Sequence, residues 1–282
     1  MTQQEKPVWF ITGCSTGFGR ALARHTLEGG YRVVVTARKP AAVADLAVGH
    51  EARALVLQLD VTKPDDIAAA VAAAEARFGR IDVLVNNAGV GYFGAIEESE
   101  ESEARRMFEI NFWGLAAMTR AVLPGMRARR SGHIVNISSM GGVRGLPGVG
   151  FYNATKFALE GLSEALACET APLGIKILIV EPSGFRTDWA GRSAHETQHP
   201  IADYEATAGV RRRQLRGYSG KQSGDPARAA AAIVKAVEAP DAPQRLMLGR
   251  IALAAGRDKI EAMKRDFESW AAVSEGADFP DP

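Results

Sequence analysis

Tyr152 and Lys156 stand four residues apart in a helix-like stretch of the chain. This spacing places a phenol and an ammonium on one face of a helix. A phenol has an ordinary pKa of ~10, so acid/base work near neutral pH requires a lower pKa, and a nearby cation favours the phenolate. The pair is a candidate for general acid/base catalysis, although such spacing alone is more often an ordinary helix face.

A serine stands upstream of this pair, at Ser139, directly after the strand-like residues 134–138. Its hydroxyl could hold the oxygen of a carbonyl group while Tyr152 exchanges a proton with it. Ser139, Tyr152 and Lys156 are therefore predicted to form one catalytic group, provided that the fold brings them together.

A glycine-rich turn runs from Thr12 to Gly19, between an apolar run and a helix-like stretch. Glycines in such a turn let backbone N–H groups approach a pyrophosphate, and the start of the helix adds partial positive charge. After the first strand of an α/β pattern, this turn favours dinucleotide binding over a merely tight turn. The predicted contacts are Gly13, Ser15, Thr16, Gly17, Phe18 and Gly19.

The end of the second apolar run indicates which dinucleotide binds. About 20 residues after the glycines, an NAD enzyme would carry an acid for the ribose 2′-hydroxyl, but here the chain reads Arg38-Lys39. The planar guanidinium of Arg38 suits a 2′-phosphate. The sequence therefore favours NADP(H) over NAD, against the alternative that Arg38 only solvates a strand end.

The glycine turn also matches G-x-S-x-G, the nucleophile elbow of a serine hydrolase, with Ser15 as the nucleophile. That fold takes part of its oxyanion hole from an earlier strand and loop, and only 12 residues precede Gly13. The hydrolase is a remote alternative.

A second competing motif is H-E-x-x-H, at His195 to His199. On a helix it would bind zinc, but Pro200 disfavours helical geometry at His199 and no third ligand is evident nearby. We predict a solvated segment and no metal site.

Composition narrows the class of protein. Of the 282 residues, 46% are hydrophobic, as in an ordinary globular protein. The 34 Lys and Arg residues and the 33 Asp and Glu residues give a formal net charge of +1, which leaves no basic field to bind nucleic acid. Two distant cysteines, Cys14 and Cys168, fit a reducing compartment. With a short polar start and no apolar run near ~18 residues, the expectation is a cytoplasmic protein without an integral membrane segment.

The elements that must position these residues alternate between strands and helices. Short, nearly continuous apolar runs predict about seven strands, at residues 8–12, 32–37, 54–58, 83–86, 133–137, 176–180 and 245–248. Strands apolar on both faces belong to a covered parallel sheet. The predicted fold is therefore a doubly wound, Rossmann-type α/β sheet with helices on both faces, in one domain over residues 1–282.

Three other segments complete the prediction. Residues 103–129 form a helix, bent near Pro124. Residues 183–224 are polar and irregular, and we expect a substrate lid with short helices. Residues 256–273 form a closing amphipathic helix.

Independent motifs then point to one family. The chain carries Thr12-Gly-x-x-x-Gly17-x-Gly19, Asp60-Val61, Asn86-Asn87-Ala88-Gly89, Asn111, Ser139, Tyr152-x-x-x-Lys156 and Pro182 to Thr187, in order. From about Val8 to Thr187 it resembles the short-chain dehydrogenases/reductases. The stretches around Phe18 and after Lys156 are similar to the branch with the 17-beta-hydroxysteroid and retinol dehydrogenases.

The resemblance implies a role for each matching residue. Tyr152 would be the general acid/base, Lys156 would lower its pKa and hold the nicotinamide ribose, Ser139 would orient the substrate oxygen, and Asn111 would anchor a water in a proton relay. Asp60 and Val61 would meet the adenine. The remaining cofactor contacts would be Asn87, Ala88, Gly89, Phe185 and Thr187. The family usually has Gly after Pro182, and Ser183 stands there, so we expect an altered backbone path or an extra hydroxyl contact near the nicotinamide.

The sequence therefore predicts an NADP(H)-dependent oxidoreductase that interconverts a small-molecule alcohol and its carbonyl compound. The alternative from another class is a non-catalytic, dinucleotide-binding redox sensor. Family resemblance also implies a homodimer or homotetramer, paired through the helices that contain Asn111 and Tyr152.

Overall fold

Seven short apolar segments form one parallel sheet in the computed structural model, which describes residues 6–279 and leaves 1–5 and 280–282 outside the described residues. In spatial order the strands run β3-β2-β1-β4-β6-β7-β9. Their bounds are β1 Val8–Ile11, β2 Arg32–Ala37, β3 Ala54–Gln58, β4 Val83–Asn86, β6 Gly132–Ile137, β7 Ile175–Pro182 and β9 Arg245–Leu248. The predicted doubly wound sheet is confirmed, with strand bounds that differ from the prediction by at most two residues.

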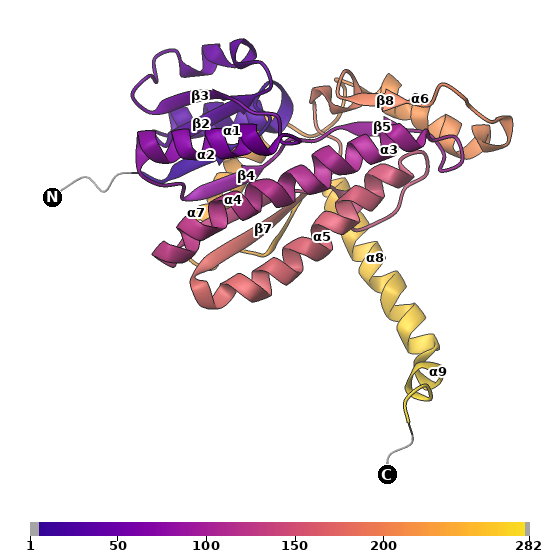
Figure 1. Ribbon diagram of the computed structural model, residues 1–282. Coiled ribbons are helices and arrows are strands. Elements are labelled where there is room, and N and C mark those ends of the chain that lie inside the picture. The colour runs from indigo at the N-terminus through magenta and orange to yellow at the C-terminus, as the bar shows by residue number, and fades with distance from the viewer. Residues whose placement is uncertain (1–5, 280–282) are drawn as a thin grey trace.

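Helices cover both faces of this sheet (Figure 1). On one face lie α1 (Gly17–Glu28) and α7 (Pro226–Glu238). On the other lie α2 (Pro64–Phe78), α4 (Gly114–Arg129) and α5 (Gly150–Thr170). Because both faces are buried, the strands are apolar at nearly every position.

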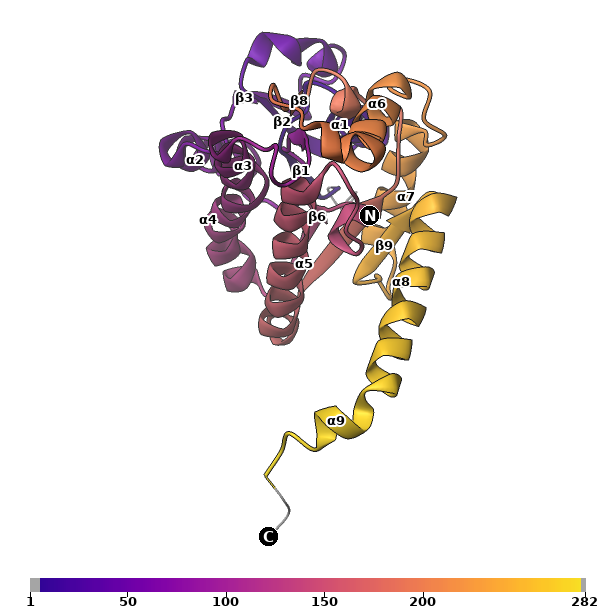
Figure 2. The ribbon, with the colours of Figure 1, turned by 90° about the vertical axis from the view of Figure 1, so that its right-hand side faces the viewer.

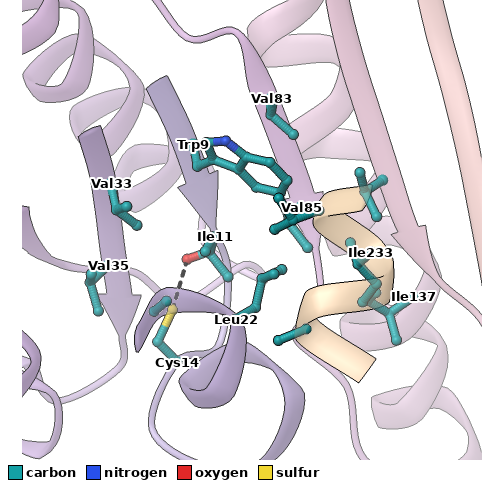
Figure 3. Close-up of a cluster of buried hydrophobic side chains, with 14 of the residues drawn as sticks. Trp9, Ile11, Cys14, Leu22, Val33, Val35, Val83, Val85, Ile137 and Ile233 are labelled. Carbon is teal, nitrogen blue, oxygen red and sulfur yellow. Dashed lines mark hydrogen bonds between the residues drawn. The ribbon is translucent and has the colours of Figure 1, made fainter. Parts of the chain in front are cut away.

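Strand β1 shows how one short segment serves both layers. Successive side chains of a strand point to opposite faces. Trp9 and Ile11 pack in the cluster with α1 and α7, whereas Val8 and Phe10 pack in the cluster with α2 and α4. Figure 3 shows the first cluster, in which Trp9, Ile11 and Leu22 lie between the sheet and the helices. All four residues of β1 are buried, which anchors the turn that follows it.

The strand order reverses at β1, which pairs with β2 on one side and β4 on the other. At such a point the connections leave toward opposite faces and open a crevice at the carboxyl ends of the strands. The turns after β1 and β4 therefore border the same crevice.

The helix predicted over 103–129 is interrupted earlier than expected. It consists of α3 (Glu101–Phe108), a π-helical turn (Glu109–Trp113) and α4, while Pro124 lies inside α4. The interruption contains Asn111, so it falls on a residue that the motifs singled out; π-helical turns often occur at functional sites.

The segment 183–224 contains the expected short helices and a strand that the sequence did not reveal. Strand β8 (Ala194–Glu196) pairs in parallel with β5 (Gly91–Phe93), and α6 (Val210–Gly217) follows. This second, two-stranded sheet ties the segment to the loop after β4.

The C-terminal helix starts six residues before the predicted position. Gly249, with a φ of 91°, turns the chain from β9 into α8 (Arg250–Ser269), and α9 (Ala271–Glu275) continues it. Among residues 6–279, none of the helices has the length and apolar character that crossing a membrane requires.

Candidate active site

A cleft of about 1580 Å³ opens at the carboxyl edge of the sheet. It is larger than the ~300–1,000 Å³ typical of a small-ligand pocket, so it has room for a dinucleotide and a second molecule. Most of the residues predicted to bind cofactor or substrate line it: Gly13, Ser15, Thr16, Gly17, Phe18, Arg38, Asp60, Val61, Asn87, Ala88, Gly89, Ser139, Tyr152, Lys156, Phe185 and Thr187.

The turn after β1 leaves no space for a side chain at Gly13. Gly13 has a φ of 71°, and a Cβ atom there would lie 3.0 Å from the Ala88 Cα. Helix α1 begins at Gly17 without a side-chain cap and without an acidic residue in its first turn. Such a backbone cradle with an uncapped helix start suits a phosphate group, so the turn fits a pyrophosphate.

Two side chains hold this turn against the end of β4. The Thr12 hydroxyl accepts hydrogen bonds from the backbone N–H groups of Asn87 at 2.9 Å and Ala88 at 3.0 Å. The Asn87 amide in turn donates to the carbonyls of Thr12 and Gly13. Sequence reasoning gave Thr12 no role, although its place directly after β1 was a usable signal.

Gly19 does not line the cleft, contrary to its prediction as a cofactor contact. A Cβ atom at this position would lie 2.4 Å from the Asn87 Nδ2 and 2.5 Å from the Gly13 carbonyl oxygen. Gly19 therefore allows α1 to approach the turn closely, behind the surface that a ligand would touch.

Ser139, Tyr152 and Lys156 meet on the opposite wall of the cleft. Ser139 follows β6 and caps the short turn Met140–Gly142, while Tyr152 and Lys156 lie one turn apart on α5. The Ser139 Oγ accepts a hydrogen bond from the Gly141 N–H at 3.0 Å, and this side chain is near enough to Tyr152 to lower the pKa of the phenol. The Lys156 Nζ donates to the Ile137 carbonyl at 2.7 Å and lies 5.8 Å from the centre of the Tyr152 ring.

Burial dominates the acidity of both ionisable groups. It raises the pKa of Tyr152 to about 12, and the nearby Ser139 side chain opposes that rise. Burial lowers the pKa of Lys156 to about 8, while the negative charge of Glu160 acts in the opposite direction. The expectation that Lys156 lowers the pKa of Tyr152 is not met by the protein groups, because the ammonium is directed at the Ile137 carbonyl.

Next to Lys156 on α5 begins an ionic network, buried at Glu160 and Glu181 and exposed at Arg245 and Glu164, that sequence reasoning missed. Glu160, one turn further along α5, accepts a hydrogen bond from the Ser138 hydroxyl and forms an ion pair with Arg245 at 2.6 Å. Arg245 also binds Glu164 at 2.5 Å and the fully buried Glu181. Burial and the nearby Glu160 raise the pKa of Glu181 to about 7. The available signal was the four-residue spacing of Lys156, Glu160 and Glu164.

Asn111 is buried and does not line the cleft. Its side-chain oxygen accepts from the Val90 N–H at 2.8 Å, and its Nδ2 donates to the Val90 carbonyl at 3.0 Å and to Thr155 at 3.2 Å. Its side chain thus binds protein groups, and its predicted role as a water anchor stays a prediction. The side chain ties the loop after β4 to α5, next to the residues that carry the chemistry.

Arg38 and Asp60 lie together where the cleft meets the ends of β2 and β3. Burial alone would raise the pKa of Asp60, but hydrogen bonds from Thr62 and the charges of Arg38 and Lys63 outweigh it and lower the pKa. A cation and an ionised carboxylate thus share this end of the cleft.

Comparison with known proteins decides the family. The sequence model described as "short chain dehydrogenase" matches residues 7–198. The chain belongs to the short-chain dehydrogenase/reductase family.

Relatives of this family resemble the chain over most of its length. It is 38% identical over 269 residues to "Oxidoreductase BOA17" of Botryotinia fuckeliana, covering 95% of this chain and 97% of the relative. It is 40% identical over 240 residues to "3-ketodihydrosphingosine reductase" of Bacteroides thetaiotaomicron, covering 85% and 86%. "Retinol dehydrogenase 8" of Homo sapiens is 39% identical over 191 residues, covering 64% and 60%.

Solved structures of the family share the fold. A short-chain dehydrogenase from Streptomyces avermitilis is 43% identical, covers 98% of this chain and 100% of its own, and superposes with a TM-score of 0.91. One from Burkholderia phymatum in complex with NAD is 26% identical, with coverages of 93% and 97% and a TM-score of 0.80. An alcohol dehydrogenase from Thermococcus sibiricus complexed with 5-hydroxy-NADP is 27% identical, covers 86% of this chain and 96% of its own, and superposes with a TM-score of 0.71. The protein is an NAD(P)-dependent dehydrogenase/reductase.

Around Tyr152, apolar side chains line the cleft of this family member, and the segment 183–224 adds polar ones that include Arg192, Arg211 and Gln214. Trp189 packs on the Tyr152 ring with centroids 4.8 Å apart. Of the neighbouring aromatic residues, Tyr92 and Phe93 are buried core residues, and Phe151 packs nearby without lining the cleft. The apolar residues that do line this part include Val90, Leu146, Val149, Trp189, Ala190 and Leu215.

The departure from the family motif at Ser183 is accommodated by a glycine. A Cβ atom on Gly249 would lie 2.4 Å from the Ser183 hydroxyl oxygen. The extra hydroxyl therefore fills space beside the start of α8, and the Ser183 N–H donates to the Leu248 carbonyl at 3.0 Å.

Neither competing motif has the surroundings that it needs. His195 and Glu196 lie in strand β8, not on a helix, so the H-E-x-x-H residues do not share one helical face. Ser15 does lie on a strand-to-helix turn, between β1 and α1, but among the described residues no strand precedes β1 to supply the rest of an oxyanion hole.

Proposed function

We propose that this protein is an NADP(H)-dependent oxidoreductase that interconverts an alcohol and its carbonyl compound, with Tyr152 as the general acid/base. One observation carries the proposal. Ser139, Tyr152 and Lys156 line the same cleft as the glycine turn after β1. A dinucleotide held by that turn would direct its nicotinamide end toward these three side chains, past Phe185 and Thr187.

Each residue then has a distinct task during reduction. When bound, the nicotinamide supplies the hydride to the carbonyl carbon. Ser139 holds the carbonyl oxygen with its hydroxyl, and Tyr152 gives its phenolic proton to that oxygen as negative charge develops. Lys156 contributes positive charge near the Tyr152 ring, and its ammonium offers a hydrogen-bond donor to the ribose of the cofactor. In the oxidation direction, Tyr152 takes the proton back.

The raised pKa of Tyr152 fits the reduction direction. With a pKa raised to about 12, the phenol is protonated at neutral pH and ready to act as an acid. As a base it needs a further positive charge nearby, which an oxidised nicotinamide would supply. The enzyme would therefore depend on the bound cofactor to make Tyr152 a base.

We assign the opposite end of the dinucleotide to Arg38, Asp60 and Val61. Arg38 would hold the 2′-phosphate of NADP, while Asp60 and Val61 would meet the adenine. Asn87, Ala88 and Gly89 would line the middle of the dinucleotide. Relatives of known structure carry NAD in one case and 5-hydroxy-NADP in another, so the preference rests on Arg38.

We further propose a largely apolar substrate, because apolar side chains line the cleft around Tyr152. Two relatives are named as a reductase of 3-ketodihydrosphingosine and as a retinol dehydrogenase. The direct test is a panel of long-chain and cyclic ketones and alcohols, assayed with NADPH and NADH side by side. Turnover of apolar carbonyls with NADPH supports the proposal. Tight NADPH binding with no turnover of any compound would favour the non-catalytic redox sensor.

A homodimer or homotetramer belongs to the same proposal. Trp113, the last residue of the π-helical turn, is 56% exposed, and Phe157 on α5 is 44% exposed. Large apolar side chains exposed on the helices that flank Asn111 and Tyr152 are suited to pairing between copies.

A further inference from the structure

Helix α8 extends away from the sheet, and α9 continues it farther from the body, as both views show (Figure 1, Figure 2). Its first part packs on β9: a Cβ atom on Gly256 would lie 2.5 Å from the Met247 sulfur. From Arg257 to the described end of the chain at residue 279, every residue is exposed or half-buried.

Helix α8 and the residue after it carry an apolar stripe, which we call the α8 stripe: Leu253, Ile260, Met263, Phe267 and Trp270, all but Leu253 in this free part. With Gly256 included, the spacing alternates between three and four residues. Such spacing is the seam by which one helix packs along another. Ile260, Phe267 and Trp270 are 64%, 65% and 64% exposed, so the outer part of the seam lies open.

The area of the stripe fits a contact between copies. A buried aromatic side chain covers ~150–250 Å². For an aliphatic side chain, the usual free energy of burial at about 25 cal/mol per Å² corresponds to roughly 60–120 Å². At the observed exposures the stripe and Val273 present on the order of 500 Å² per copy. Two copies would bury about 1,000 Å² of apolar surface, which reaches the lower limit of a specific interface before any polar contact is added.

The charges of α8 favour a protein over a membrane as the partner. Its polar face carries five basic residues (Arg250, Arg257, Lys259, Lys264 and Arg265) and four acidic ones (Asp258, Glu261, Asp266 and Glu268). Helices that lie on anionic membranes are instead strongly basic on the polar face. A nearly neutral mixture neither attracts an anionic bilayer nor repels a second identical helix.

We propose that the α8 stripe is an interface with a second copy of this chain, in which two stripes meet about a two-fold axis. An isologous contact needs a patch that is complementary to itself, and an apolar seam of this spacing meets that requirement. The interface is separate from the face that contains Trp113 and Phe157. If both form, the chain assembles as a tetramer with two kinds of two-fold contact.

The test is the mass of the purified protein in solution, measured by light scattering or sedimentation over a range of concentrations. The double variant Ile260→Glu/Phe267→Glu places two charges in the stripe. The matched control, Ala254→Glu/Ser269→Glu, adds the same charge to exposed positions on the other side of α8. We expect wild type and control to have equal mass, an even multiple of the monomer, and the stripe variant to have half of it with unchanged far-UV circular dichroism.

A wild-type monomer, or a stripe variant with the wild-type mass, would overturn the proposal. Flotation with vesicles of phosphatidylcholine and phosphatidylserine adds the competing partner: a monomeric wild type that floats through the stripe would assign this surface to a membrane. Neither measurement depends on the cofactor or the substrate, so its failure leaves the proposed enzymatic function untouched.

Discussion

At the scale of single residues, the acidity of the site depends on which atoms the charged side chains contact. The Lys156 ammonium is bound to the Ile137 carbonyl, and Tyr152 is shifted by burial and by Ser139 instead. The sequence correctly brought these three residues together, because their spacing follows from one helix and one strand end. It did not reveal that burial raises the pKa of Tyr152 in the protein without cofactor, because burial and the direction of a flexible side chain are properties of the packed structure.

Arg38 provides a residue-scale prediction. Replacing Arg38 by Asp removes the guanidinium proposed to bind the 2′-phosphate and places a carboxylate where it would repel that group. We expect the ratio of dissociation constants, Kd(NADPH) over Kd(NADH), to rise by about 10²-fold, or about 2.7 kcal/mol. Titration of both cofactors into wild type and variant measures the ratio. Lys39→Asp serves as the neighbouring control, and an unchanged ratio in Arg38→Asp would refute the assignment.

At the scale of elements, α5 carries Tyr152, Lys156, Glu160 and Glu164 at successive four-residue intervals. Its bounds and those of the strands were predictable, since apolar runs ending at polar or glycine residues leave few alternatives. The π-helical turn around Asn111 was not, because it arises where α3, the loop after β4 and α5 are joined through one amide side chain. Strands β5 and β8 escaped notice because each has only three residues and their pairing is a long-range contact.

The charge of Glu160 should be measurable at Lys156. Glu160→Gln keeps the size of the side chain and removes the negative charge that raises the pKa of Lys156, so that pKa should fall from about 8 by about one pH unit. Nuclear magnetic resonance of ¹³C-labelled lysine, assigned with Lys156→Met, follows it without any cofactor. The control is Glu164→Gln, which alters the same Arg245 network at a more exposed position. Equal titration curves in wild type and Glu160→Gln would disprove the coupling.

At the scale of the whole molecule, the doubly wound sheet sets where the chemistry lies. The reversal of strand order at β1 opens the crevice, and the segment 183–224, which is tied to the loop after β4 by the β5–β8 pair, lines its edge. The class of fold was predictable from the alternation of strands and helices. The exposed stripe of α8 was not, because a sequence pattern identifies an apolar face without showing whether the chain itself covers it.

Global stability should reflect the buried carboxyl of Glu181. Its pKa is raised from an ordinary value near 4.5 to about 7 in the folded protein, so between these pH values the folded state binds more protons than the unfolded state. Its contribution to stability therefore falls as pH rises through this window. Glu181→Gln should gain on the order of 2 kcal/mol in free energy of unfolding relative to wild type between pH 5 and pH 8. Denaturant unfolding of both proteins at each pH measures this, and parallel pH dependences would contradict it.

The most direct test of the account is the turnover of Tyr152→Phe. The account predicts that this variant loses about 10²-fold or more in kcat for an apolar carbonyl substrate, since only the ionisable hydroxyl is removed. It also predicts that NADPH still binds with a Kd close to that of wild type, which Arg38→Asp should weaken instead. Turnover at the wild-type rate in Tyr152→Phe would contradict the assignment of Tyr152 as the acid/base.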